Sequence, residues 1–536
     1  MAERESEPQL PEHLRPGVTL SAADIDDLRA AIARHDQHIQ QLEQSLTELN
    51  RRLQQPSPAA QLFRPVMRLA DRVAQHLKGP LRFARKLVAR VATAIEHPAW
   101  FCLVALIIQL PLVFNLGYFN HDELQWLSFA DQPSLSQIPW NAWFDFQPFQ
   151  YRPLTFNLWL LLSYYLGYHA IAMHLLRVLC GIGVALLLRA TLLRFDVPAR
   201  RASVATLVFL LLPEVVYTHA WIGTYADSLS IAFALCAILW TLRESAPAAT
   251  AAQAIRVGLP IAALTGLALL SKESSVVVPA LLLVAAIRRR DRTLVVAIFS
   301  SALVVAAYLY LRLDTILFAP RNEGAYVWSV ANIPDRLSEY AIFPFLIGRF
   351  DAMGAYADQH VVFALVCLGI FLLAVSRAGW RFIAALCLGW VAALGPTLIL
   401  SYSANHYAYV SAAFACGLVA IAWSRLHKPA RLTIAVLAVI ACTHGYEEAK
   451  EMRRIGRVQH HLYEGLTRIL DHSTAPVRIK AAREKEDFIL RRVLHEIPSY
   501  KRIPFGDRVV VIPYSDNSIT PTYVMAGNGR LSAVSP

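Results

Sequence analysis

The segment from residue 99 to 116, Ala-Trp-Phe-Cys-Leu-Val-Ala-Leu-Ile-Ile-Gln-Leu-Pro-Leu-Val-Phe-Asn-Leu, decides the fold class. It carries no charged residue, and about 20 such residues are what a helix needs to cross a bilayer. Similar runs recur up to residue 443, and the 536-residue chain is 56 % hydrophobic but only 17 % charged. Soluble domains carry about 25 % charged residues. The sequence therefore predicts an all-α, polytopic membrane protein.

We expect eleven transmembrane helices. They are residues 98–116, 171–193, 202–217, 226–242, 255–270, 275–287, 293–312, 361–376, 381–400, 408–424 and 432–443. The turns between them alternate in charge, since one set is rich in arginine and the other holds acidic and aromatic residues. By the positive-inside rule the arginine-rich turns are cytoplasmic. A cytoplasmic N-terminus then places the C-terminus outside an inner (plasma) membrane.

The net charge of +12 is explained by these basic turns, so it does not predict a nucleic-acid partner. None of the seven cysteines has a CxxC spacing, and no His and carboxylate pair has the spacing of zinc ligands. The sequence therefore predicts neither a disulfide nor a metal site.

Three segments precede the membrane region. Residues 1–20 are polar and rich in proline, which is typical of disorder. Residues 21–56 have apolar residues at steps of three and four, which predicts a coiled coil and a homo-oligomer formed through it. A single amphipathic helix packed on its own protein is the alternative. Residues 57–97 interleave basic and apolar side chains, which suits a helix lying on the lipids of the inner leaflet.

The first outer loop, residues 117–170, carries a pair of carboxylates, Asp122 and Glu123, just after an apolar segment. Carboxylates in this position face water, a cavity or a partner, because lipid disfavours their charge. A solvated acidic loop is the alternative. Arg152 precedes Pro153, so its backbone is extended and its side chain leaves the loop at the membrane surface. It either binds a functional anion or extends to lipid headgroups.

Lys272 and Glu273 form a charged pair on a tight outer turn. A lysine on that side opposes the positive-inside trend, so we expect it to bind a phosphate at the membrane boundary, with Glu273 holding it in place. Simple charge compensation at the lipid surface is the alternative. Acids in one outer loop and bases at outer helix ends suit a lipid-phosphate sugar donor. A carboxylate, Asp122 or Glu123, would take the proton of an acceptor hydroxyl, and cations would stabilise the departing phosphate.

At these residues the chain resembles the C-type membrane glycosyltransferases (the GT-C superfamily), and within it the protein O-mannosyltransferases and aminoarabinose transferases. The matching pieces include Asn-His-Asp-Glu (120–123), Tyr-Arg-Pro-Leu (151–154), Leu-Ser-Lys-Glu-Ser (270–274) and Asn-His-Tyr-Ala-Tyr (405–409). The resemblance covers residues 98–425. It implies an inverting transfer from a polyprenyl-phosphate sugar, with Asp122 as the base. Glu123 would assist, or bind a divalent cation where the enzyme uses one.

The resemblance also extends the candidate site. We expect Arg152, Lys272 and Arg349 to bind the donor phosphate. The residues expected to contact substrate are His121, Tyr151, Asp227, Glu273, His406 and Tyr407. Relatives often carry Gly-Arg before the aspartate where this chain has Tyr225-Ala226, and Arg-Tyr where it has His406-Tyr407. The identity of the donor is therefore left open.

The predicted catalytic domain spans residues 98–443. Residues 444–536 are expected to form a small extracytoplasmic α+β domain, with a helical pattern up to residue 497 and a strand in Arg-Val-Val-Val-Ile-Pro. The acceptor, whether protein, lipid or glycan, is not identified by the sequence. Two other functions stay open: a transporter or flippase for a lipid-linked sugar, and a coiled-coil scaffold with a degenerate enzyme fold.

Overall fold

The computed structural model describes residues 22–54, 90, 93–243, 250–318, 327–473 and 475–534. The chain divides into two compact units, Met1–Ala89 and Arg90–Pro536. Within the first unit, helix α1 (Ala22–Gln54) covers most of the predicted coiled-coil segment. Its side chains at Ile39 and Leu42 are exposed, and the coiled coil and the homo-oligomer stay predictions. Residues 1–20 and 57–89 lie outside the described residues.

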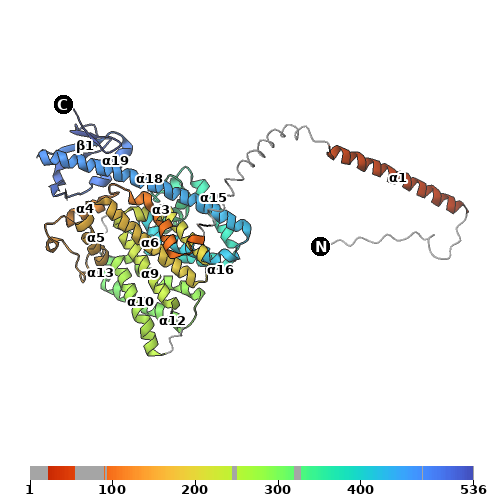
Figure 1. The fold of residues 1–536 in the computed structure, drawn as a ribbon, viewed down its shortest axis with the longest axis horizontal. Coiled ribbons are helices and arrows are strands. Elements are labelled where there is room, and N and C mark those ends of the chain that lie inside the picture. Colours follow the sequence, from red (N-terminus) through yellow and green to blue (C-terminus); the bar gives the residue numbers. More distant parts are fainter. Residues whose placement is uncertain are drawn as a thin grey trace. The chain divides into compact units, whose positions relative to one another are not determined.

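The second unit is a bundle of helices (Figure 1). Its longer helices are α3 (Pro98–Val113), α6 (Ala170–Arg194), α7 (Ala199–Leu211), α8 (Pro213–Ala220), α9 (Tyr225–Arg243), α10 (Ala251–Ser271), α12 (Arg292–Leu311), α15 (Val361–Ser376), α16 (Trp380–Leu394), α17 (Tyr409–Ala422) and α18 (Lys428–His472). Shorter helices connect them. These include α4 (His121–Ala130), α5 (Pro153–Leu166), α11 (Val278–Leu282), α13 (Leu313–Phe318) and α14 (Ile333–Ile342).

Seven helices in the described part of the chain are long and apolar enough to cross a membrane. An eighth span results if α7 and α8 count as one helix, which bends by 66° where Pro213 follows Leu212. Proline disfavours helical backbone in the residue before it, which explains the bend. The structure thus shows a multi-pass helical membrane protein.

The predicted number of eleven spans is not confirmed. Each predicted segment contains helix, but Pro98–Val113, Glu273–Ile287 and Val361–Ser376 are shorter than the other spans. At 1.5 Å per residue, a helix of the length of α3 covers about 24 Å, whereas the hydrocarbon core is about 30 Å thick. Apolar runs located these helices but did not give their lengths.

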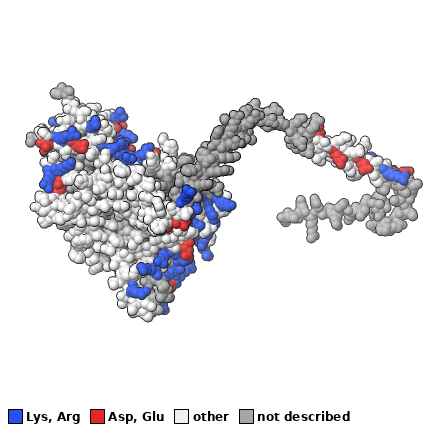
Figure 2. Space-filling model, viewed as in Figure 1, with Lys and Arg blue, Asp and Glu red and all other residues white. Residues whose placement is uncertain are grey.

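The turns of the bundle fall into two groups at its opposite ends. At the end that we call the basic end, Arg288 forms an ion pair with Asp196, and Arg289 donates to the carbonyl oxygen of Thr241 at 2.9 Å. At the other, the polar end, Arg152 forms an ion pair with Glu273. Figure 2 shows a broad band of the second unit with few charged side chains between charged borders. This distribution matches a bilayer around the middle of the bundle.

Helix α18 connects the bundle to the C-terminal part of the chain (Figure 1). Beyond it lie β1 (Val477–Ala481), α19 (Glu484–Leu494), β2 (Ser499–Tyr500), β3 (Ile503–Pro504), β4 (Val509–Ile512), β5 (Tyr523–Met525) and β6 (Leu531–Ala533). The main sheet has the order β4-β1-β5-β6, in which β1 is parallel to β4 and β5, and β6 is antiparallel to β5.

The small C-terminal α+β part is therefore confirmed, but its predicted details need two corrections. The predicted boundary at residues 443 and 444 lies inside the continuous helix α18, and β1 interrupts the helical pattern expected up to residue 497. The α+β part lies on α4 at the polar end. There Ser128 Oγ bonds to Ser499 Oγ at 2.8 Å, and Gln125 Nε2 donates to the carbonyl oxygen of His495 at 3.3 Å.

Candidate functional site

The predicted carboxylate pair, Asp122 and Glu123, lies in the first turn of α4. Asn120 caps this helix and Glu123 completes a capping box, since Asn followed three residues later by Glu before an apolar run is its signature. Glu123 Oε2 accepts from the backbone N–H groups of Phe119 and Asn120 at 2.7 and 2.9 Å. Its Oε1 accepts from the N–H of Ile222 at 2.6 Å. Glu123 thus ties α4 to the turn before α9.

Glu123 is only 2 % exposed. Burial raises its pKa to about 7, because desolvation disfavours the carboxylate more than the three N–H donors favour it. Asp122 differs, since 38 % of its side chain is exposed and it contacts His121 Nε2 at 2.9 Å. The His121 ring in turn lies 4.9 Å from that of His495. Of the two acids, Asp122 is the one that a substrate can reach.

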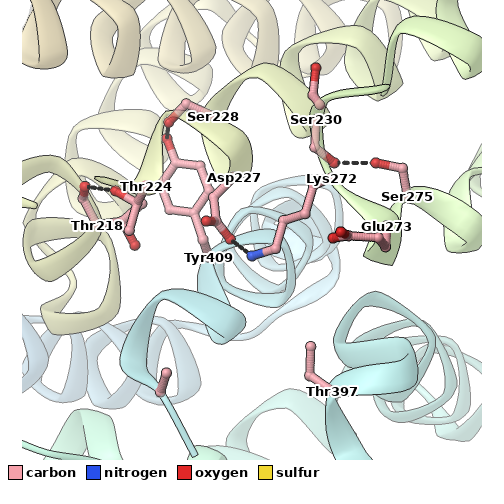
Figure 3. Close-up of polar contacts among 12 residues, drawn as sticks. Thr218, Thr224, Asp227, Ser228, Ser230, Lys272, Glu273, Ser275, Thr397 and Tyr409 are labelled. Carbon is pink, nitrogen blue, oxygen red and sulfur yellow. Dashed lines mark hydrogen bonds and ion pairs between the residues drawn. The ribbon is translucent and has the colours of Figure 1, made fainter. Parts of the chain in front are cut away.

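Lys272 and Asp227 form a buried ion pair at the polar end, with 5 % of each side chain exposed. Lys272 caps the C-terminus of α10, and Asp227 lies in the first turn of α9. In Figure 3 the ammonium and the carboxylate point toward each other. The Lys272 ammonium also lies 5.0 Å from the ring centre of Tyr407.

The expected pairing of Lys272 with Glu273 was wrong, because the partner of Glu273 is Arg152, with 2.7 Å between Nε and Oε2. The backbone at Lys272 is extended, and consecutive side chains of an extended chain point to opposite sides. Lys272 and Glu273 therefore reach different partners. Thr155 Oγ1 donates to the carbonyl oxygen of Ser271 at 3.0 Å, which fixes the start of α5 against the end of α10.

His406 interacts with both the predicted base and the predicted cations. It lies in the short helix Asn405–Ala408 and interacts electrostatically with Lys272, Arg152 and Asp122. Its ring lies 5.0 Å from that of Trp221. The structure thereby places the predicted base, the predicted cations and His406 in one region.

Tyr151 joins this region through Arg312, whose guanidinium carbon lies 5.5 Å from the tyrosine ring centre. Arg349 does not join it. Its guanidinium is used within its own loop, where it bonds to Asp358, to the Asp351 carbonyl oxygen and to that of Met353. No contact within the described ranges connects Arg349 with Lys272 or Arg152.

A cavity of about 10 Å³ borders the ion pair. Its polar lining includes Asp227, Lys272, Ser275, Thr397 and Tyr407. This volume is about what one water molecule needs. Figure 3 shows Ser275 and Thr397 near the pair, with Ser275 bonded to Ser230 at 2.6 Å.

The divalent cation that the family resemblance allows does not fit these residues. Both oxygens of Glu123 already accept backbone N–H groups. In the described part of the chain, no group of three or more His, Cys, Asp or Glu side chains is arranged to hold a metal ion.

Arg312 was missed by the sequence reasoning. It directly follows α12 at the polar end and is buried. The signal that selected Lys272, a cation at a span end opposite the arginine-rich turns, applies equally to Arg312. The Asn120–Glu123 capping box was also readable from the sequence, and it would have separated the roles of the two neighbouring acids.

No family model matches the chain, and no curated protein matches its sequence. Solved structures of the oligosaccharyltransferase of Archaeoglobus fulgidus do match. The form tethered to an acceptor peptide containing the NVT sequon has 15 % identity and a TM-score of 0.39, covering 76 % of this chain and 60 % of that one. The same enzyme, AglB, in complex with an inhibitory peptide and a dolichol-phosphate, has 14 % identity and a TM-score of 0.39 over the same shares.

This chain thus spans about 60 % of the length of these structures. The archaeal enzyme is itself a member of the GT-C superfamily. The narrower resemblance to O-mannosyltransferases and aminoarabinose transferases is not confirmed. At a TM-score of 0.39, this likeness supports no conclusion about the function of this chain.

Proposed function

We propose that the protein is a membrane glycosyltransferase that moves a sugar from a polyprenyl-phosphate donor to an acceptor hydroxyl, with inversion. One observation carries this proposal. The partly exposed carboxylate of Asp122 and the cations Arg152 and Lys272 are all electrostatic neighbours of the same side chain, His406. A base and phosphate-binding groups within one region are what this transfer needs.

In this mechanism Asp122 accepts the proton of the acceptor hydroxyl while its oxygen attacks the anomeric carbon of the sugar. The bond between that carbon and the phosphate oxygen breaks, and the departing phosphate keeps the electron pair. In this proposal Arg152 stabilises the negative charge that develops on the phosphate. Glu123 holds the start of α4, and Asp227 holds Lys272. These two carboxylates position the reacting groups without exchanging protons.

We also propose that the polar end faces away from the cytoplasm. The basic end carries Arg288 and Arg289, and arginine-rich turns favour the cytoplasmic side. The C-terminal α+β part lies at the polar end through Gln125 and Ser128 of α4, so it would share the side of the acceptor. The membrane is then an inner (plasma) membrane whose outer face holds the reaction.

The test uses purified protein in detergent with a panel of polyprenyl-phosphate sugars and measures the release of free polyprenyl phosphate. We expect release by the wild type and a loss of about 10²- to 10⁴-fold in Asp122→Asn, which is the usual contribution of a general base. Asp145→Asn is the matched control, because Asp145 is an exposed acid of the same loop. It should keep wild-type activity.

Two results would overturn the proposal in different ways. Full activity in Asp122→Asn would remove the base assignment but keep the enzyme class. If no donor is cleaved even when a crude membrane extract supplies acceptors, the glycosyltransferase is wrong. Movement of a lipid-linked sugar across proteoliposomes would then identify a transporter.

A further inference from the structure

Arg312 is a buried cation at the polar end. It follows the last residue of α12 and is 2 % exposed. Its Nη2 donates to the carbonyl oxygen of Phe149 at 2.8 Å. Its guanidinium carbon lies 5.5 Å from the ring centre of Tyr151 and 5.9 Å from that of Tyr308. The side chain is therefore held in place by the outer loop and by two aromatic rings.

Four buried hydrogen-bonding atoms at or near Arg312 have no partner within the described part of the chain. These are Nε and Nη1 of Arg312 itself, the hydroxyl of Tyr308 and Oε1 of Glu273. A buried polar group without a partner is unfavourable, and more so if it is charged, so such groups are rare unless a ligand or water completes them. The two guanidinium nitrogens and the tyrosine hydroxyl are donors. They suit the oxygen atoms of an anion.

The charges around Tyr308 also favour an anion. This side chain interacts electrostatically with Glu273, Arg312 and Arg152. Glu273 already forms its ion pair with Arg152. Lys272, the next cation, is paired with Asp227. Of these three cations, Arg312 is the one for which the described part of the chain shows no ion pair with a carboxylate.

Asp145 is the other acid of this neighbourhood, since it interacts electrostatically with Tyr151. It is exposed, and within the described ranges it forms no ion pair with Arg312. A buried charge without a counterion is strongly unfavourable. An anion bound at Arg312 would remove this cost.

We propose that Arg312 and Tyr308 bind a phosphate oxygen, so that the phosphate site extends from Arg152 along the end of α12. Guanidinium groups bind phosphate through charge-assisted hydrogen bonds. In the context of the proposed function, the ligand is the phosphate of the lipid-linked donor and of the polyprenyl-phosphate product. The same chemistry would also accept a phospholipid headgroup or inorganic phosphate, and the experiment separates these sources.

The experiment measures binding to the full-length protein in detergent with three probes: farnesyl phosphate, phosphatidic acid and inorganic phosphate. The key variant is Tyr308→Phe, which removes only a hydroxyl that bonds to no described residue and should leave thermal stability unchanged. We expect its affinity for farnesyl phosphate to fall about tenfold, the size of one hydrogen bond to a charged group. Arg312→Gln should lower it further. Tyr310→Phe is the matched control, because Tyr310 lies on the same helix and is 80 % exposed.

Arg312→Gln also loses the bond to Phe149, so it is interpreted only if its melting temperature stays close to that of the wild type. Wild-type affinity for farnesyl phosphate in Tyr308→Phe overturns the anion site but leaves the proposed function intact. Binding of only phosphatidic acid or inorganic phosphate, if it depends on Tyr308, supports the anion site and contradicts the lipid-linked donor. Failure of all three probes to bind the wild type overturns the anion site.

Discussion

The two ends of the bundle use the same ionic chemistry in opposite environments. At the polar end, Lys272 and Asp227 have 5 % of each side chain exposed. At the basic end, the corresponding fractions for Arg288 and Asp196 are 44 % and 68 %. An exposed pair contributes little, because water screens it, whereas a buried pair requires both charges to lose their water.

The two ends of the bundle therefore use charged side chains in different ways. At the basic end the arginines act through their number and their side of the membrane, so the geometry of a single pair is unimportant. At the polar end Lys272 and Arg152 each have a carboxylate partner from another element: Asp227 of α9 pairs with Lys272, and Glu273, just after α10, pairs with Arg152. Such costly, fixed charges are what a site needs if it is to receive a charged ligand.

The largest expected effect tests this contrast directly. Asp227→Asn leaves the Lys272 ammonium buried without its counter-charge, and breaking a buried pair in this way costs about 3–5 kcal/mol. Asp196→Asn breaks the exposed pair and should cost no more than about 1 kcal/mol. Asp196 has a positive φ of 56°, which asparagine tolerates well, so the control adds no backbone strain. Both are measured by unfolding in detergent.

Equal losses in the two variants would break the comparison between the ends. A small loss in Asp227→Asn would mean that water reaches Lys272. A large loss in Asp196→Asn would mean that the basic end also depends on a specific pair.

The sequence predicted the helices and the grouping of the turns, because both depend on local composition. Each predicted apolar run contains helix in the structure, and arginine content separated the turns that the structure places at the basic end. Helix lengths were less predictable. The end of α3 at Val113 and the bend at Pro213 depend on how each helix meets its neighbours.

The residues of the site were predicted better than their partners. Asp227, Lys272, Arg152, Glu273 and His406 were all selected from turns of one group. The pairing of Lys272 with Asp227 across 45 residues is set by the packing of α9 on α10, which spacing along the chain does not encode. Arg312 was missed because it closes an apolar run and was counted as part of the span.

The second expected effect concerns Glu123, which is buried at the polar end and has a pKa of about 7. Because this pKa is higher than the value of 4.5 in the unfolded chain, the folded state holds the proton more tightly. Its contribution to stability is complete below pH 4.5 and is lost as the pH rises through 7. We expect a loss of about 2 kcal/mol between pH 5 and pH 8.

The measurement is the melting temperature of wild type and Glu123→Gln over this pH range. The wild type should become less stable as the pH rises, and the variant should respond less. Glu496→Gln, at an exposed carboxylate of the C-terminal part, should behave as the wild type does. A wild-type protein that gains stability from pH 5 to pH 8, with the gain absent in Glu123→Gln, would contradict the assigned pKa direction.

The smallest expected effect is the difference in stability loss between variants of two fully buried threonines, one near each end of the bundle. Thr155 Oγ1 donates to the carbonyl oxygen of Ser271. Because Ser271 is the last residue of α10, this oxygen accepts no N–H from its own helix. Thr241 Oγ1 donates to Ala237 within α9, whose carbonyl oxygen already accepts a helical N–H. Thr155→Val should therefore cost about 1 kcal/mol, and Thr241→Val close to none.

Thr155→Val should also affect activity, because the lost bond positions Arg152 against Glu273 and Lys272. We expect kcat for polyprenyl-phosphate release to fall several-fold in Thr155→Val and to stay unchanged in Thr241→Val. If both variants lose stability equally and keep full activity, the polar end tolerates movement between α5 and α10. Its cations would then not need the fixed arrangement on which the contrast with the basic end depends.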